Sequence, residues 1–251
     1  MADMGTRFTT EGLVIKEMKV GESDRLVTLF TRDYGIIKAF ASGAENIKSK
    51  KNSSTSLLTY ASFTILQKKG TMRIYEAAPI TRFFTLGSDV EILALSQYFC
   101  ELGYVFGEND TPNEELLRLI LNSLHFITKD KKYPPLIKAI TEFRTAVISG
   151  YMPDLVACKE CGKFEDDIMF FDLKDGSLTC SECKKTSQTV ALNRTVLSSL
   201  RHIAFSEFGR LYSFEIPNNS ADLLSDITSQ YLLTQTEQRF SALDFYNSFK
   251  N

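Results

Sequence analysis

Four of the five cysteines in the sequence lie in two closely spaced pairs. Cys158 and Cys161 form the first C-x-x-C pair, Cys180 and Cys183 form the second, and 18 residues separate the two pairs. A C-x-x-C pair places two sulfurs on one tight turn, so two such pairs can supply the four thiolates of a tetrahedral zinc site. The spacing therefore predicts one structural Zn²⁺ bound by these four cysteines.

Other kinds of cysteine chemistry fit this pattern less well. Two disulfides would need an oxidising compartment, and nothing marks the chain as secreted. A redox dithiol needs only one C-x-x-C pair, and a catalytic zinc keeps an open coordination position. A zinc deaminase also needs an H-x-E motif, which is absent from the sequence. The fifth cysteine, Cys100, lies in an apolar run and is expected to be a small buried residue.

The remaining motifs give no indication of an enzyme. The sequence contains no G-x-x-x-x-G-K-[ST], G-x-G-x-x-G or G-x-S-x-G motif. Its two histidines, His125 and His202, have no neighbouring partner pattern that would make either a general base. We therefore expect a protein that binds and does not catalyse.

Composition indicates a globular chain. Hydrophobic residues make up 43% of the 251 residues, which is enough to form a substantial core. No apolar run is long enough for a transmembrane helix, and the first residues have no apolar signal segment, so we expect a cytoplasmic protein without a membrane partner.

Basic residues are concentrated near the N-terminus. The net charge is −2, yet residues 1–80 contain 12 Lys and Arg against 8 Asp and Glu. Between Lys38 and Arg73, seven basic residues face a single acid, Glu45. A basic lobe on an acidic body suggests a module that binds a polyanion.

The N-terminal 80 residues have the pattern of a small β-barrel. Five β-rich runs are separated by short turns and by one polar loop at 42–55. We expect strands at about 12–16, 26–31, 36–41, 58–67 and 72–77. Five strands is the count of an OB-fold, and an SH3-like barrel is the alternative.

Apolar spacing changes to a helical period after residue 85. A capping box at Ser88 and Glu91 begins the first helix, and a second box at 111–114 places Pro112 at the first helical position. A third helix runs from about Pro135 to Gly150. After the cysteine segment, further helices are expected at 193–205 and 220–235.

The basic lobe is the candidate site for nucleic acid. Barrels that bind single strands combine basic grooves with aromatic side chains on which bases stack. Aromatic residues at alternating strand positions, such as Phe40, Phe63 and Tyr75, are more often barrel core. A solvated loop is the alternative explanation for the lysines. The residues predicted to contact phosphates are Arg25, Lys38, Lys48, Lys50, Lys51 and Arg73.

Two further hypotheses belong to other functional classes. In the first, the chain is mainly an adaptor, and apolar residues between its helices, with Arg144 nearby, receive an acidic and hydrophobic tail peptide. In the second, the chain is a zinc-dependent enzyme, which would require an open position at the metal.

The order of these features resembles the RecO family of recombination mediators. Residues 21–35 match its N-terminal pattern, and Ser42-Gly43-Ala44 followed by Lys48-Ser49 matches its basic loop. Glu101-Leu102 fits its first long helix. The most specific match is residues 150–155 running into Cys158-x-x-Cys161-Gly162. The resemblance covers roughly residues 8–200 and fades at 234–251.

The resemblance implies an α+β protein with an N-terminal five-stranded OB-fold β-barrel at 1–82. A helical domain would follow at 83–251, with a Cys₄ zinc ribbon inserted at about 154–188. It also implies a cytoplasmic, nucleoid-associated DNA-repair factor that is not an enzyme. Such a factor binds single- and double-stranded DNA, anneals complementary strands and joins RecR, with RecF as a further partner. It helps load RecA onto DNA coated by single-strand-binding protein (SSB), whose C-terminal tail it contacts.

Overall fold

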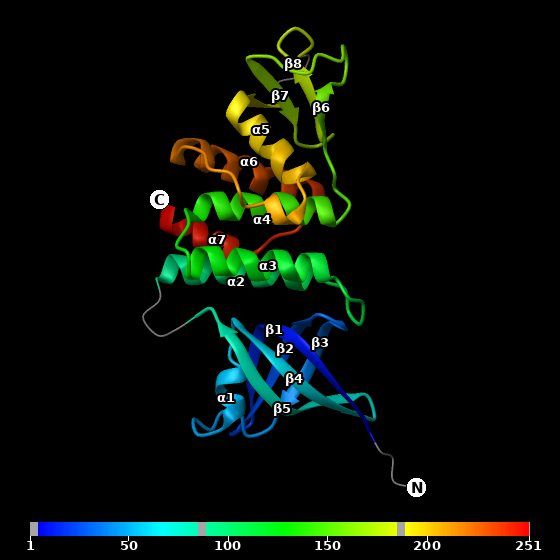
Figure 1. Ribbon diagram of the computed structural model, residues 1–251, viewed down its shortest axis with the longest axis vertical. Coiled ribbons are helices and arrows are strands. Elements are labelled where there is room, and N and C mark those ends of the chain that lie inside the picture. Colours follow the sequence, from blue (N-terminus) through cyan, green and yellow to red (C-terminus); the bar gives the residue numbers. More distant parts are fainter. Residues whose placement is uncertain (1–4, 85–88, 185–188, 251) are drawn as a thin grey trace. The chain divides into compact units, whose positions relative to one another are not determined.

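The computed structural model describes residues 5–84, 89–184 and 189–250, and for Lys50 and Lys250 it describes the backbone only. The chain forms two compact units (Figure 1). One comprises Met1–Asp130 with Phe240–Asn251, and the other comprises Lys131–Arg239. No helix of the described residues is both long enough and apolar enough to cross a membrane.

A closed five-stranded barrel forms the N-terminal part of the first unit. Its strands are β1 (Thr6–Val20), β2 (Asp24–Thr31), β3 (Gly35–Ala41), β4 (Thr59–Lys68) and β5 (Thr71–Arg82). Around the barrel the order is β1-β2-β3-β5-β4, and the short helix α1 (Lys50–Ser54) connects β3 to β4. Side chains alternate between the two faces of a strand, and the inward set forms a buried core that includes Val27, Ile37 and Phe63. The predicted strands are therefore confirmed.

Two long helices and a short one complete the first unit. They are α2 (Val90–Phe106), α3 (Glu114–Thr128) and α7 (Ser241–Asn247), and the 3₁₀ turn η2 (Ser248–Lys250) follows. Gly103 lets α2 approach the barrel, since a Cβ on Gly103 would lie 3.1 Å from the Phe30 ring and 2.8 Å from Ile120. Glu101 on α2 receives hydrogen bonds from the Ser241 hydroxyl, at 2.6 Å, and from the Ala242 N–H, at 3.0 Å. These helices belong to the barrel's unit, so the compact units do not coincide with the predicted ranges 1–82 and 83–251.

The second unit combines helices with a small sheet. Its helices are α4 (Pro134–Ile148), α5 (Arg194–Phe205) and α6 (Asn218–Thr236), with the 3₁₀ turn η1 (Phe208–Arg210). Its strands are β6 (Asp154–Cys158), β7 (Ile168–Asp172), β8 (Ser177–Cys180) and β9 (Thr189–Asn193). They pair in the order β6-β8-β7-β9, so the predicted insertion among the helices is a four-stranded sheet.

Some predicted helix starts differ from those in the structure. The α2 cap is Asp89, whose carboxylate accepts the Glu91 N–H at 2.8 Å, and Ser88 lies outside the described residues. The α3 cap is Asn113, so Pro112 precedes the helix and does not occupy its first position. Asn113 takes the N-cap position because its side chain accepts the Leu116 N–H at 3.1 Å and so satisfies a backbone donor at the start of the helix. Helix α6 begins at Asn218, two residues before the predicted Ser220 cap.

Candidate metal centre and nucleic-acid interface

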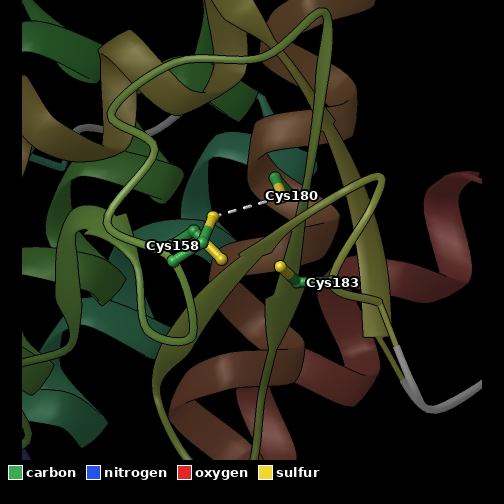
Figure 2. Close-up of side chains that lie close together, drawn as sticks. Cys158, Cys180 and Cys183 are labelled. Carbon is green, nitrogen blue, oxygen red and sulfur yellow. Dashed lines mark hydrogen bonds between the residues drawn. The ribbon is translucent and has the colours of Figure 1, made fainter.

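The four paired cysteines come together on two turns of the second unit. Cys158 ends β6 and Cys180 ends β8, and the parallel pairing of these strands aligns Cys158 with Leu178. Figure 2 shows the sulfurs of Cys158, Cys180 and Cys183 turned toward a common point. All four sulfur atoms lie within 4.8 Å of one another, and the Cys161 and Cys180 sulfurs are 3.8 Å apart. The predicted grouping is confirmed, and these residues can hold one metal ion.

Backbone groups around the first turn favour a thiolate. Burial raises the pKa of the Cys158 thiol, but hydrogen bonds from the backbone N–H groups of Cys161, Cys180 and Glu160 lower that pKa, leaving it at about 6. Hydrogen bonding to Cys161 and Cys180, together with burial, raises the pKa of Cys183 to about 12. Four sulfurs crowded this closely cannot all ionise without a cation between them.

Polar contacts tie the two cysteine turns to each other and to a helix. Asp166 accepts hydrogen bonds from the Ser181 hydroxyl, at 2.6 Å, and from the Ser181 N–H, at 3.1 Å, next to Cys180. Arg201 on α5 donates to the carbonyls of Leu155 and Phe164, at 2.8 and 2.9 Å. Its guanidinium also lies 4.2 Å from the Phe164 ring centre. The sheet is therefore anchored to α5 on the side of the first turn.

Arg25, one of the six predicted phosphate contacts, faces the wrong way for that role. It is only 8% exposed, and it pairs with Ala41 on the inward face of β2. Its guanidinium lies 2.9 Å from Glu17 and 2.9 Å from Glu45. It also donates to Asn52, Thr55 and Ser56. These contacts engage the Nε and Nη1 atoms of the buried side chain, so the prediction that Arg25 contacts DNA is corrected: Arg25 forms structural ion pairs.

The lysines of the predicted basic loop are not equivalent. Lys48 is exposed, whereas Lys51 is half-buried and its ammonium donates to the Ile74 carbonyl at 2.9 Å. This contact ties α1 to β5 and leaves Lys51 less available to a ligand. The side chain of Lys50 lies outside the described residues.

Lys38 and Arg73 are exposed on the outer face of the barrel, within two rows of side chains that cross neighbouring strands. Residues directly opposite on paired strands share a face, and the residues beside them, such as Val27 and Ala39, point into the core. The first row is Lys16, Thr28 and Lys38, and the second is Met18, Leu26, Phe40 and Arg73. We call these seven residues the barrel platform.

Sequence reasoning missed Lys16, Met18 and Leu26, although the i, i+2 spacing of Lys16 and Met18 on one strand was a usable signal.

The expectation that Phe40, Phe63 and Tyr75 belong to the barrel core was partly wrong. Phe63 is fully buried in the core, but Phe40 is half-exposed on the platform and Tyr75 is 54% exposed. Tyr75 lies beneath Arg7, whose guanidinium carbon is 4.4 Å from the ring centre.

A shallow groove is present in the second unit. It has a volume of about 230 Å³, and its lining includes Leu136, Ile140, Tyr212 and Phe214 together with the charged residues Lys132 and Glu215. Arg144 is not among the lining residues. Its guanidinium donates to the carbonyls of Ile203 and Ala204, at 3.2 and 3.0 Å, and so caps the end of α5. The adaptor hypothesis expected Arg144 near the peptide site, whereas the structure places Arg144 at the end of α5 and not in the lining of this groove.

Comparison with known proteins assigns both parts of the chain. Residues 4–83 match the family described as recombination protein O N terminal, and residues 87–244 match recombination protein O C terminal. A protein of Acetivibrio thermocellus named DNA repair protein RecO is 31% identical over 238 residues, which cover 94% of each chain. A protein of Caldicellulosiruptor bescii with the same name is 29% identical over 237 residues, covering 94% of this chain and 96% of its own. The chain therefore belongs to the RecO family.

Proposed function

We propose that this chain acts in DNA repair as a recombination mediator without enzymatic activity. It would bind single- and double-stranded DNA, anneal complementary strands and, together with RecR, help load RecA onto SSB-coated single strands. RecF is a further proposed partner, and the site of action would be the nucleoid. Family membership and the name of the relatives, DNA repair protein RecO, support this proposal.

The barrel would be the DNA-binding module, with the fold of an OB domain. Its support is a closed five-stranded barrel with the strand order β1-β2-β3-β5-β4. OB-folds bind oligonucleotides on the face formed by their second and third strands. The platform residues Leu26 and Phe40 lie on these two strands, and their neighbours extend the surface onto β1 and β5.

The observation that carries the proposal is the side-by-side arrangement of an apolar row and a basic row on the platform. Bases would stack on Phe40 and pack against Met18 and Leu26, since every base has an apolar face. Lys16 and Lys38 would contact phosphates along one side of the apolar side chains, and Arg73 would do so at the end of their row. Neutralising part of the backbone charge while leaving base edges accessible would lower the repulsion between two complementary strands.

Zinc is the metal that we propose for the four cysteines. A Zn–S distance of about 2.3 Å in a tetrahedron places sulfurs roughly 3.8 Å apart, close to the Cys161–Cys180 separation of 3.8 Å. Four thiolates would complete the coordination shell, so the ion would hold the two turns together and leave no open position for a substrate. This role is structural.

The groove of the second unit supports a second candidate function, the adaptor role. Most of the lining is apolar and it includes one lysine, Lys132, and one acid, Glu215. Such a groove suits a short, mainly apolar peptide whose acidic group would pair with Lys132. The C-terminal tail of SSB is the proposed occupant, and it would bring the barrel to SSB-coated DNA.

A salt titration of single-strand binding tests the main proposal. Replacing Lys16, Lys38 and Arg73 together by Ala should reduce the slope of log K against log[salt] by about 2, at about 0.7 for each phosphate contact. The matched control replaces three exposed lysines elsewhere, Lys129, Lys131 and Lys174, and should keep the slope. An equal slope for the platform variant and the parent protein would contradict the proposal.

A further inference from the structure

Ile47 is an unusually exposed apolar side chain. It is 91% exposed, whereas the other large apolar side chains of the described residues are at most 55% exposed. It lies in the loop between β3 and α1, beside the exposed Lys48. Isolated apolar residues on a surface are common, so exposure alone does not indicate a function for Ile47. The structure of the loop that carries it provides the further evidence.

The loop around Ile47 is held by hydrogen bonds on both sides. The Asn46 side chain accepts the Lys48 N–H at 3.0 Å, and the Asn46 carbonyl accepts the Ser49 N–H at 2.8 Å. The Asn52 amide donates to the Ala44 carbonyl at 2.8 Å, and Ala44 is fully buried. Because these hydrogen bonds already fix the backbone of the turn, contact between Ile47 and a ligand would cost little backbone entropy.

The same loop is fastened to the end of the barrel platform. It begins directly after Phe40 and Ala41, and the Gly43 N–H donates to Asp24 at the start of β2, at 2.9 Å. The hydrogen bond from Gly43 lowers the pKa of Asp24, and the nearby charge of Arg73 lowers it further. Ile47 therefore belongs to a loop that starts directly after β3, the strand of Phe40, and is hydrogen-bonded to the start of β2, the strand of Leu26.

We propose that Ile47 is a wedge that enters between two bases of a single strand lying on the platform. The inference rests on the proposed function. Proteins that deform nucleic acids insert Ile, Leu, Met or Phe between base steps and so unstack them. A single apolar side chain with a basic neighbour suits this use, whereas a protein partner would need a continuous apolar patch. Unstacking at the edge of the platform would expose base edges to a complementary strand.

The test uses the full-length protein and a single strand of about 16 nucleotides that carries several 2-aminopurines. Anisotropy of an end label reports affinity, and 2-aminopurine fluorescence rises when bases unstack. The variants are Ile47→Ser and Ile47→Phe, and the control is Ile80→Ser, which alters a 51% exposed isoleucine on β5. Because Ile47 is almost fully exposed, neither substitution at this position should affect folding.

The expected result is a loss of most of the fluorescence rise in Ile47→Ser, with affinity reduced about fivefold or less and the salt slope unchanged. Ile47→Phe should restore the rise, and Ile80→Ser should match the parent protein. If the parent protein binds the strand and Ile47→Ser gives the same fluorescence rise, the wedge is disproved and the proposed function stands. If the parent protein does not bind single strands, the proposed function fails, and the wedge with it.

Discussion

The Arg25 side chain lies on the inward face of β2, where its guanidinium forms ion pairs with Glu17 and Glu45. Its contacts with Asn52 and Thr55 join the strand to the segment that follows the basic loop. Arg25 therefore helps to hold this segment in place against β2. Its effect on any ligand would be indirect, through the position of Lys48 and Ile47.

We predict that Arg25→Leu lowers the free energy of unfolding by about 2 kcal/mol. At a fully buried site, removing one partner of an ion pair would lower the stability by more than about 2 kcal/mol. Here the Glu17 and Glu45 carboxylates are partly exposed, so water screens them and the loss is smaller. Urea unfolding measures the change. The exposed Arg73→Leu is the control and should stay within about 0.5 kcal/mol of the parent. Equal stability of the two variants would show that Arg25 is not a structural residue.

At the scale of elements, the pairing of β6 with β8 brings the two cysteine turns together. The contacts of Arg201 then join the sheet to α5. Neither the strand pairing nor the Arg201 hydrogen bonds involve a metal, and the four sulfurs lie within 4.8 Å of one another. A bound ion would thus stabilise an arrangement that strand pairing already favours.

Cys158→Ser should abolish metal binding and lower the melting temperature by about 10 °C. Metal binding energy contributes directly to folding, and each kcal/mol shifts the melting temperature by about 2–4 °C in a chain of this size. Metal analysis and a thermal melt of the purified protein provide the two readouts. Cys100→Ala is the control, because that variant should keep its metal. A Cys158→Ser protein that lacks metal and melts like the parent would rule out the structural role.

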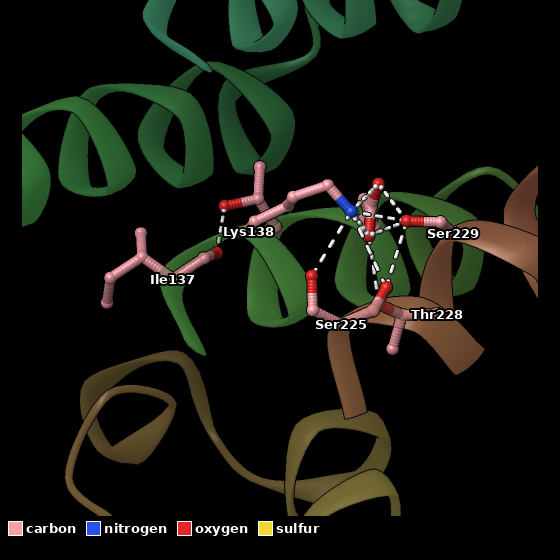
Figure 3. Close-up of polar contacts among 7 residues, drawn as sticks. Ile137, Lys138, Ser225, Thr228 and Ser229 are labelled. Carbon is pink, nitrogen blue, oxygen red and sulfur yellow. Dashed lines mark hydrogen bonds and ion pairs between the residues drawn. The ribbon is translucent and has the colours of Figure 1, made fainter. Parts of the chain in front are cut away.

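Helices α4 and α6 share a buried polar cluster (Figure 3). Lys138 is 2.9 Å from Glu142, and the side chains of both are almost fully buried. Thr228 and Ser229 on α6 donate to Glu142, each at 2.9 Å, and Lys138 also contacts Ser229 and Ser225. The cluster fixes how the two helices meet, since a shift of either one would leave a buried charge without partners.

A double-mutant cycle tests this pairing. Lys138→Met alone should cost about 3–5 kcal/mol, because the Glu142 carboxylate is left buried without its cation. The double variant Lys138→Met with Glu142→Leu should recover most of that loss, since two apolar side chains of similar size replace the pair. Urea unfolding supplies the four stabilities. Additive effects of the two substitutions would contradict a coupled ion pair.

At the scale of the whole molecule, features set by local spacing could be predicted from the sequence. The five strands and the grouping of the four cysteines follow from alternation and from C-x-x-C spacing. The exposure of Phe40 and the burial of Arg25 could not be predicted in this way. Successive residues of a strand point to opposite faces, so a shift of one residue in strand register would exchange the buried and exposed side chains.

The return of the C-terminus to the first unit could not be predicted from local pattern. Phe240 packs edge-on to Tyr98, with ring centres 5.4 Å apart, and Leu243 and Tyr246 of α7 are buried. These contacts join residues more than a hundred positions apart. Short apolar segments such as 240–246 carry too little periodicity to reveal such a partner.

The central claim is that a single strand lies across the barrel platform, and photo-crosslinking tests it most directly. A single strand substituted with 4-thiothymidine would be irradiated with the full-length protein, and the crosslinked tryptic peptides identified by mass spectrometry. We predict crosslinks in the peptides 26–32 and 39–48, which contain Leu26, Phe40 and Ile47. Crosslinks confined to residues 131–239 would contradict the account.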